Sequence, residues 1–167
     1  MHETEADLQR LQRLLDDSYA VSGSHLLRVG TPERRLDADS LTYLLDGVRI
    51  LALATVTADG RPLIGPVDGV FYRGEFWFGS ADDAVRVRHL RTRPQVSATH
   101  VVGEELAVTV HGRAEEMDLS LPTNRGFRDC CLEVYGPDWE EWGAPAPYLR
   151  IRAEKMFAFA FTDPEAA

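Results

Sequence analysis

The chain has 167 residues, of which 44% are apolar and 27% charged, the balance of one globular domain that folds without a metal or disulfides. Eighteen basic residues against 27 acidic ones give a net charge of −9, which removes the broad electrostatic attraction on which nucleic-acid binding depends. No apolar run approaches the length of about 20 residues that a bilayer span requires. The composition therefore argues against nucleic-acid and membrane partners.

Residues 1–47 predict an N-terminal helical extension. Four leucines at helical spacing follow a Thr4–Asp7 capping pair, which indicates an amphipathic helix over about 4–20. A second short helix is expected after a cap at Asp37 or Asp39, ending at Gly47. The opening MHETEADLQRLQRLL lacks the basic start and continuous apolar core of a signal peptide, so a cytoplasmic location is expected.

Residues 48–167 predict the main domain, which is mostly β with short helices (α+β). Strands are expected at 48–57, 62–72, 75–80, 95–102, 105–118 and 148–162, with helices at 81–93 and 122–135. Asp59-Gly60 and Gly103-Glu104 supply the turns of two hairpins. Antiparallel strands in hairpin order favour a small closed barrel. The last strand is apolar on both faces and is expected to be buried on both.

A phosphate site is one interpretation of the segment after the third strand. Ser80 stands where the following helix is expected to begin, and Arg86 and Arg88 lie one to two turns further on. A hydroxyl, free backbone N–H groups and guanidinium groups at a helix N-terminus together suit a phosphate. Alternatively, Ser80 caps the helix with Asp83 as its partner and the arginines face solvent. Asp82 and Asp83 would oppose an anion there.

Other polar and aromatic residues each leave two interpretations open. Asp68 lies in an apolar strand, where it either pairs with an arginine or contacts a ligand. The adjacent Cys130 and Cys131 are expected to be reduced thiols rather than a vicinal redox pair. The late loop 136–148 carries two tryptophans and a tyrosine, which form either an aromatic pocket or interface, or a lid over the barrel. The histidines have no metal-ligand spacing, so no metal site is expected.

The run from Val48 to Ala114 resembles the pyridoxamine-phosphate-oxidase-like group of flavin-binding split barrels. The most telling pieces are Ala54-Thr55-Val56, the turn Asp59-Gly60-Arg61-Pro62, Ser80, and the arginine helix Arg86-Val87-Arg88-His89-Leu90 followed by Arg93-Pro94-Gln95-Val96-Ser97. The resemblance implies a split β-barrel homodimer with a flavin, FMN or the deazaflavin F420, in each cleft between the two barrels.

The same resemblance implies which residues bind the cofactor. Ser80, Arg86 and Arg88 would hold its phosphate, whereas the ring would lie against backbone of Ala54, Thr55, Val56, Pro66, Val67 and Asp68. True pyridoxamine-phosphate oxidases carry an arginine and a lysine where this chain has Gly65 and Val70. The resemblance therefore implies a relative of those oxidases with another substrate.

Three functions follow from these observations. The leading hypothesis is an FMN- or F420-dependent oxidoreductase acting on a small molecule, in which the cofactor carries the hydride chemistry and no side chain need be the catalyst. The alternative is a non-catalytic module that binds a cofactor or haem in the same cleft, because a fold does not fix a function. A structural dimer with an empty cleft is the third.

Overall fold

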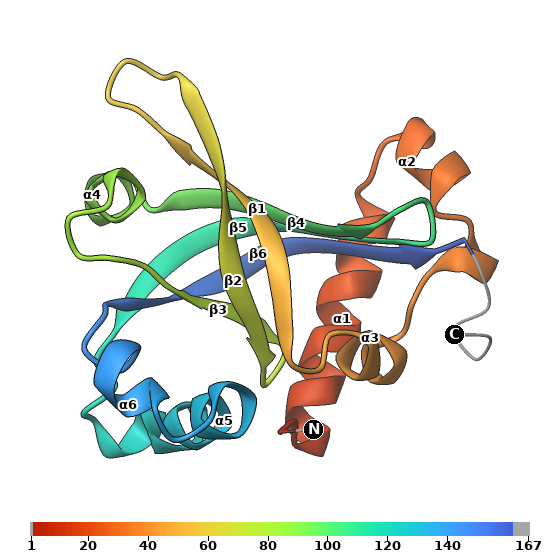
Figure 1. Ribbon diagram of the computed structural model, residues 1–167. Helices are drawn as coiled ribbons and strands as arrows, with labels where there is room; N and C mark the ends of the chain where they lie inside the picture. Colours follow the sequence, from red (N-terminus) through yellow and green to blue (C-terminus); the bar gives the residue numbers. More distant parts are fainter. Residues whose placement is uncertain (1, 162–167) are drawn as a thin grey trace.

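The computed structural model describes residues 2–161, and its centre is a closed barrel of six antiparallel strands (Figure 1). The strand order around the barrel is β1-β2-β3-β6-β5-β4. Hairpins join β1 to β2, β2 to β3 and β4 to β5, whereas helical segments connect β3 to β4 and β5 to β6. This confirms the predicted mostly β barrel with short helices. The strands are β1 (Val48–Val56), β2 (Pro62–Tyr72), β3 (Glu75–Gly79), β4 (Gln95–Val102), β5 (Leu106–Met117) and β6 (Tyr148–Ala160).

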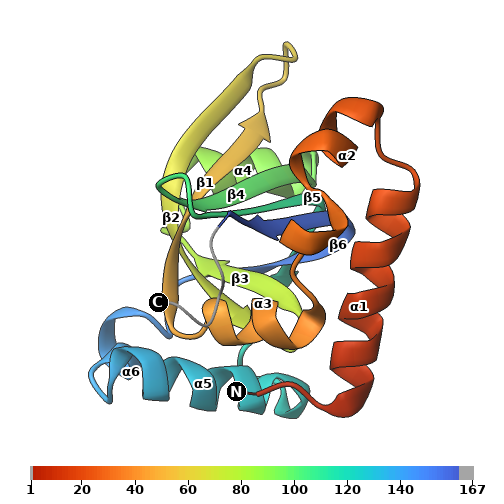
Figure 2. The ribbon, with the colours of Figure 1, turned by 90° about the vertical axis from the view of Figure 1, so that its right-hand side faces the viewer.

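The helices lie outside the barrel (Figures 1 and 2). The predicted capping box is present, with Thr4 and Asp7 bonded to each other, and Asp37 caps the third helix. The structure adds α2 and a 3-10 turn between the two predicted N-terminal helices, and α6 in the segment expected to be the late loop. The helices are α1 (Glu5–Ala20), α2 (Ser24–Val29), η1 (Pro32–Arg34), α3 (Ala38–Leu44), α4 (Val85–Thr92), η2 (Pro122–Asn124), α5 (Arg125–Tyr135) and α6 (Trp139–Trp142).

The barrel interior and the N-terminal helices share one hydrophobic core. Leu11 and Leu15 of α1 and Leu41 of α3 belong to the same buried cluster as the inward side chains of the strands. Figure 2 shows α1 running along one side of the barrel. The hydroxyl of Tyr19 donates to the carbonyl of Ala158 at 3.0 Å, so α1 is also tied to β6 by a buried polar contact.

The two faces of β6 are not equally buried, contrary to the prediction. Met156 and Ala158 point into the barrel and are fully buried. On the other face Phe157 is half-buried against the Tyr19 ring, and Phe161, just beyond the strand, is exposed. The reason is that α1 covers only part of the outer face of β6. The predicted last strand residue, Thr162, lies outside the described residues.

A second, aromatic core lies outside the barrel under α5 and α6. It covers the outer face of β2 and β3, where the Trp77 ring stacks on Phe127 with 4.2 Å between ring centroids. Trp139 is completely buried there and donates its indole N–H to the Tyr148 hydroxyl at 2.8 Å. The late loop therefore packs as a structural layer against the side of the barrel.

Candidate functional site

The site begins at an unpaired edge of β2. This strand pairs with β1 along Pro62–Val70, but with β3 only from Gly69 onward. The hairpin of β1 and β2 consequently projects beyond the rest of the barrel, with α4 packed beside it (Figure 1). Backbone groups along the free edge need partners from elsewhere.

Arg86 of α4 reaches this edge. Its Nη1 donates to the Pro66 carbonyl at 2.7 Å, and a Cβ added to Gly65 would lie 3.3 Å from its Nη2. The absent side chain at Gly65 thus leaves room for the guanidinium group. Within residues 2–161 neither Arg86 nor its neighbour Arg88 forms an ion pair, although Arg88 contacts the Asp83 carbonyl at 3.4 Å. Both groups keep N–H donors for an anionic ligand.

Two further contacts fix α4 against the hairpin. His89 Nδ1 lies 3.0 Å from the Thr55 hydroxyl, and Arg93 Nε donates to the Val56 carbonyl at 3.0 Å. The Thr55 side chain is buried in this contact and faces the helix. The sequence did not identify His89 and Arg93 as site residues. The only feature that could have pointed to them is their place in the predicted arginine-rich helix.

The predicted helix start at Ser80 is wrong. The helix begins at Val85 and its N-cap is Ala84, which has no side-chain hydrogen bond to offer. Ser80 instead follows β3 in an extended link, where its N–H donates to the Pro147 carbonyl at 3.2 Å. Ser80 therefore does not lie at the helix N-terminus and does not cap the helix with Asp83. Ser80 is half-buried, and its hydroxyl has no hydrogen-bond partner among the described residues.

The acidic residues after Ser80 are partly neutralised. Asp82 pairs with Arg91 at 2.7 Å, and the same guanidinium binds Glu116 at 2.7 Å. The hydrogen bond from Arg91 lowers the pKa of Glu116. Because Arg91 holds the Asp82 carboxylate, Asp82 opposes an anion near Arg86 less than the sequence alone suggests.

The predicted ring-binding residues divide between the two faces of the hairpin. Ala54 and Val56 are half-buried and Pro66 and Asp68 exposed, all on the outer face, whereas Thr55 and Val67 are buried on the inner one. The strand alternation is the cause. A ligand on the outer face would therefore meet four of the six residues.

Asp68 forms no salt bridge within residues 2–161, contrary to one of the two expectations for it. It is exposed on the outer face of β2, so its charge needs no partner. Its charge adds to the effect of burial in raising the pKa of Tyr148 to about 12.

The two cysteines are both free and buried in α5. Burial raises the pKa of the Cys130 thiol to about 12. Both thiols belong to the aromatic core, and they remain protonated and inert at neutral pH.

A family model described as pyridoxamine 5'-phosphate oxidase matches residues 38–157, most of the chain. The chain belongs to the pyridoxamine 5'-phosphate oxidase family. The match begins in α3 and ends in β6, so it spans every strand and the α4 contacts described above.

Solved structures share this fold. A conserved hypothetical protein from Mycobacterium tuberculosis has a TM-score of 0.64 and 19% identity, covering 77% of this chain and 88% of its own. An FAD-binding protein from Mesorhizobium loti has a TM-score of 0.59 and 25% identity, covering 77% and 98%. The heme storage protein HutZ from Vibrio cholerae has a TM-score of 0.58 and 20% identity, covering 66% and 86%. No curated protein matches the chain.

The two basic residues of true pyridoxamine-phosphate oxidases are replaced here by Gly65 and Val70, and the structure gives a different reason at each position. At Gly65 the Arg86 guanidinium lies where a side chain would point, so a cation reaches that edge from α4. Val70 is buried in the aromatic core beside Trp77, where a lysine would lose its hydration without a partner.

Among residues 2–161 no helix is long and apolar enough to cross a membrane.

Proposed function

We propose that this member of the pyridoxamine 5'-phosphate oxidase family is an oxidoreductase that binds a flavin, FMN or the deazaflavin F420, and acts on a small molecule other than pyridoxamine phosphate. The observation that carries the proposal is Arg86, oriented on the free edge of β2 with N–H groups left to donate. Relatives of the same fold are described as FAD-binding proteins, which supports the choice of a flavin.

In this proposal Arg86 and Arg88 bind the phosphate of the cofactor, and the Ser80 hydroxyl donates to the same group. His89 and Arg93 do not bind it; they fix α4 relative to β1 and so keep the two arginines in place. The outer face of the hairpin at Ala54 and Pro66 supports the ring. The bound cofactor supplies hydride transfer, and the protein supplies position and charge.

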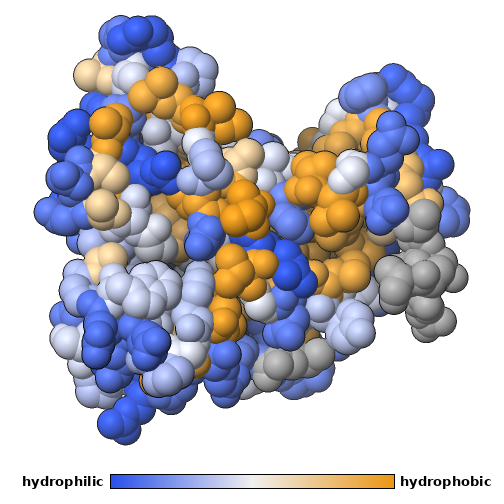
Figure 3. All heavy atoms as spheres, in the orientation of Figure 1, coloured by the Kyte–Doolittle hydropathy of each residue, from blue (hydrophilic) through white to orange (hydrophobic). Residues whose placement is uncertain are grey.

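We further propose that the outer face of the hairpin is shared with a second copy of the chain. Apolar side chains from three neighbouring strands are exposed there, and Figure 3 shows apolar surface across this part of the molecule. Single exposed apolar residues are common, but a contiguous group marks an interface. The outward positions of the group are Ile50, Ile64 and Val101, and Leu63 and Val102 are exposed next to them at the strand ends. A homodimer would place the partner's surface over the proposed cofactor ring.

The dimer is tested by the mass of the protein in solution. Ile64→Glu should shift the protein toward the monomer, because it places a charge in the proposed interface. Val21→Glu is the matched control, since Val21 is 70% exposed against 73% for Ile64 but lies at the end of α1. Equal behaviour of both variants would reject this interface.

The cofactor proposal is tested by titrating FMN and F420 into the protein and its Arg86→Ala variant. Loss of a hydrogen bond to a charged group costs about 1.5–3 kcal/mol, so we expect affinity to fall about 10- to 150-fold. Arg28→Ala in α2 is the control and should bind as the wild type does. Equal affinity in the Arg86 and Arg28 variants would refute the assignment.

Turnover separates the two function classes that the sequence leaves open. An oxidoreductase reoxidises its reduced cofactor faster when its substrate is supplied. A carrier that binds a flavin or haem without turnover shows tight binding and no acceleration with any compound in a substrate screen. Haem should be titrated alongside FMN and F420, because a protein of the same fold is described as the heme storage protein HutZ.

A further inference from the structure

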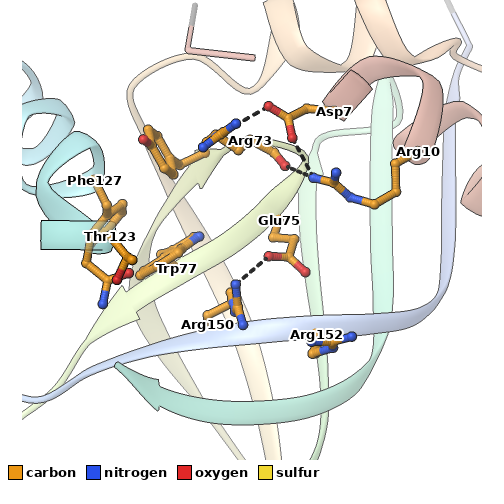
Figure 4. A pocket seen from close by; sticks show the side chains of 11 residues that line it. Asp7, Arg10, Arg73, Glu75, Trp77, Thr123, Phe127, Arg150 and Arg152 are labelled. Carbon is orange, nitrogen blue, oxygen red and sulfur yellow. Dashed lines mark hydrogen bonds and ion pairs between the residues drawn. The ribbon is translucent and has the colours of Figure 1, made fainter. Parts of the chain in front are cut away.

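A separate polar pocket lies on the side of the barrel, between the start of α1, the outer face of β3 and β6, and the start of α5 (Figure 4). Its volume is about 400 Å³, within the range of small-molecule sites. Trp77 and Arg150 are paired in register on β3 and β6, so both side chains point out of the barrel into this region. The pocket is built from other residues than the proposed cofactor site.

The charge of the pocket is positive on a strongly acidic chain. Its lining includes four arginines and two carboxylates, and Glu115 pairs with two of these arginines from just outside the lining, which leaves a formal charge of +1 where the chain carries −9. The Asp7 carboxylate is shared by Arg10 at 2.7 Å and Arg73 at 2.9 Å, so one negative charge serves two positive ones. Figure 4 shows these groups at one end of the pocket. Electrostatics there favour an anion.

At the other end two arginines face two carboxylates at unequal distances. Arg150 binds Glu115 at 2.6 Å and approaches Glu75 at only 3.5 Å, while Arg152 lies 3.7 Å from the same Glu115. Arg152 is exposed and therefore able to turn toward a ligand. An arginine held loosely beside a cavity can form a bidentate contact with an oxyanion.

Two buried N–H groups in this wall have no partner. They are the indole Nε1 of Trp77, a residue only 4% exposed, and Nε of Arg150. Among the described residues just one other buried side-chain polar atom, the Thr42 hydroxyl, is in the same state. Figure 4 shows the indole nitrogen at the end of the ring that faces Glu75 and Arg150. Buried donors are normally satisfied, and both of these are donors.

We propose that this pocket binds a small oxyanion, a carboxylate or a phosphate. Arg152 and Arg10 supply charge, and the unpartnered N–H groups of Trp77 and Arg150 supply hydrogen-bond donors once the neighbouring side chains adjust. The aromatic ring of Trp77 provides an apolar wall for the remainder of an organic acid. The site is independent of the proposed flavin site and stands whether or not a flavin binds.

The experiment follows the indole N–H signals of the full-length, nitrogen-15-labelled protein during titration with inorganic phosphate and, separately, with benzoate at constant ionic strength. Trp77→Phe identifies the Trp77 signal by its loss. We expect a saturable shift of that signal with at least one of the two anions. Whichever anion binds more tightly identifies the source of the oxyanion as a phosphate or a carboxylate.

Three variants locate the binding. Arg152→Gln should weaken it about tenfold, the effect of losing one charge-assisted hydrogen bond, while leaving Glu115 paired with Arg150. Arg28→Gln, an arginine of α2 outside the pocket, should leave the midpoint unchanged. Arg86→Gln should do the same, because it removes only the proposed cofactor site.

The proposal is overturned if neither anion shifts the Trp77 signal, or if Arg152→Gln and Arg28→Gln bind equally. A shift lost in Arg86→Gln would also overturn it, since the anion would then be acting from the cofactor site. Thermal unfolding with and without the anion provides a second readout: the wild type should be stabilised and Arg152→Gln less so.

Discussion

Asp7 is the residue whose replacement should reveal how firmly α1 is fixed to the barrel. Its side chain is 5% exposed and accepts hydrogen bonds from the Thr4 hydroxyl at 2.7 Å, from Arg10 at 2.7 Å and from Arg73 at 2.9 Å. Removing one partner of a buried ion pair costs about 3–5 kcal/mol. Asparagine retains one acceptor oxygen, and the Thr4 cap on the Asp7 backbone remains. We therefore expect Asp7→Asn to cost about 3 kcal/mol, near the lower end of that range.

Urea unfolding at neutral pH measures this cost, with Asp16→Asn as the control on an exposed face of the same helix. Burial by itself would raise the pKa of Asp7, but the hydrogen bonds from Thr4, Arg73 and Arg10 outweigh it and hold the pKa below its ordinary value of 3.8. A lowered pKa contributes stability above the unfolded-state pKa and loses it as the pH falls through the folded one. The difference between wild type and Asp7→Asn should thus shrink below about pH 4. A loss of stability at neutral pH no larger than that of Asp16→Asn would show that Asp7 does not fix α1 to the barrel.

Two other predictions concern the aromatic core. Tyr148→Phe removes the acceptor of the buried Trp139 indole N–H and should cost about 1–3 kcal/mol in urea unfolding; an unchanged midpoint would contradict the hydrogen bond. Cys130 and Cys131 should react with a disulfide reagent at pH 8 more than about a hundredfold more slowly in the native protein than in urea, because burial keeps them protonated. Rapid labelling of the native protein would show that α5 is not packed as described.

Much of the fold was predictable because its signals are local. The Thr4–Asp7 pair marks a helix start by chemistry within four residues, and Asp59-Gly60 marks a hairpin by the positive φ that Gly60 adopts. The second core was not predictable in this way. Phe127 stacks on Trp77 from another part of the chain, and Trp139 joins the same cluster through Tyr148. The hydrophobic periodicity of the sequence does not indicate which strand face α5 will cover.

The candidate site was predictable in its residue types and not in its geometry. The arginine-rich helix pointed to Arg86, but the helix starts at Val85 because Ala81–Ala84 form a turn first. Ser80 is thereby removed from the helix terminus. The relation between Gly65 and Arg86 depends on an edge of β2 left unpaired by a short β3, which is a property of the tertiary fold.

The central claim, that the chain binds a flavin through Arg86, is tested most directly by the absorption spectrum of the purified protein, followed by mass spectrometry of whatever heat releases. We expect a bound flavin or F420 in the wild type, acquired on titration if lost in purification, and its loss in Arg86→Ala with the fold intact. A wild-type protein that takes up neither FMN nor F420 would contradict it.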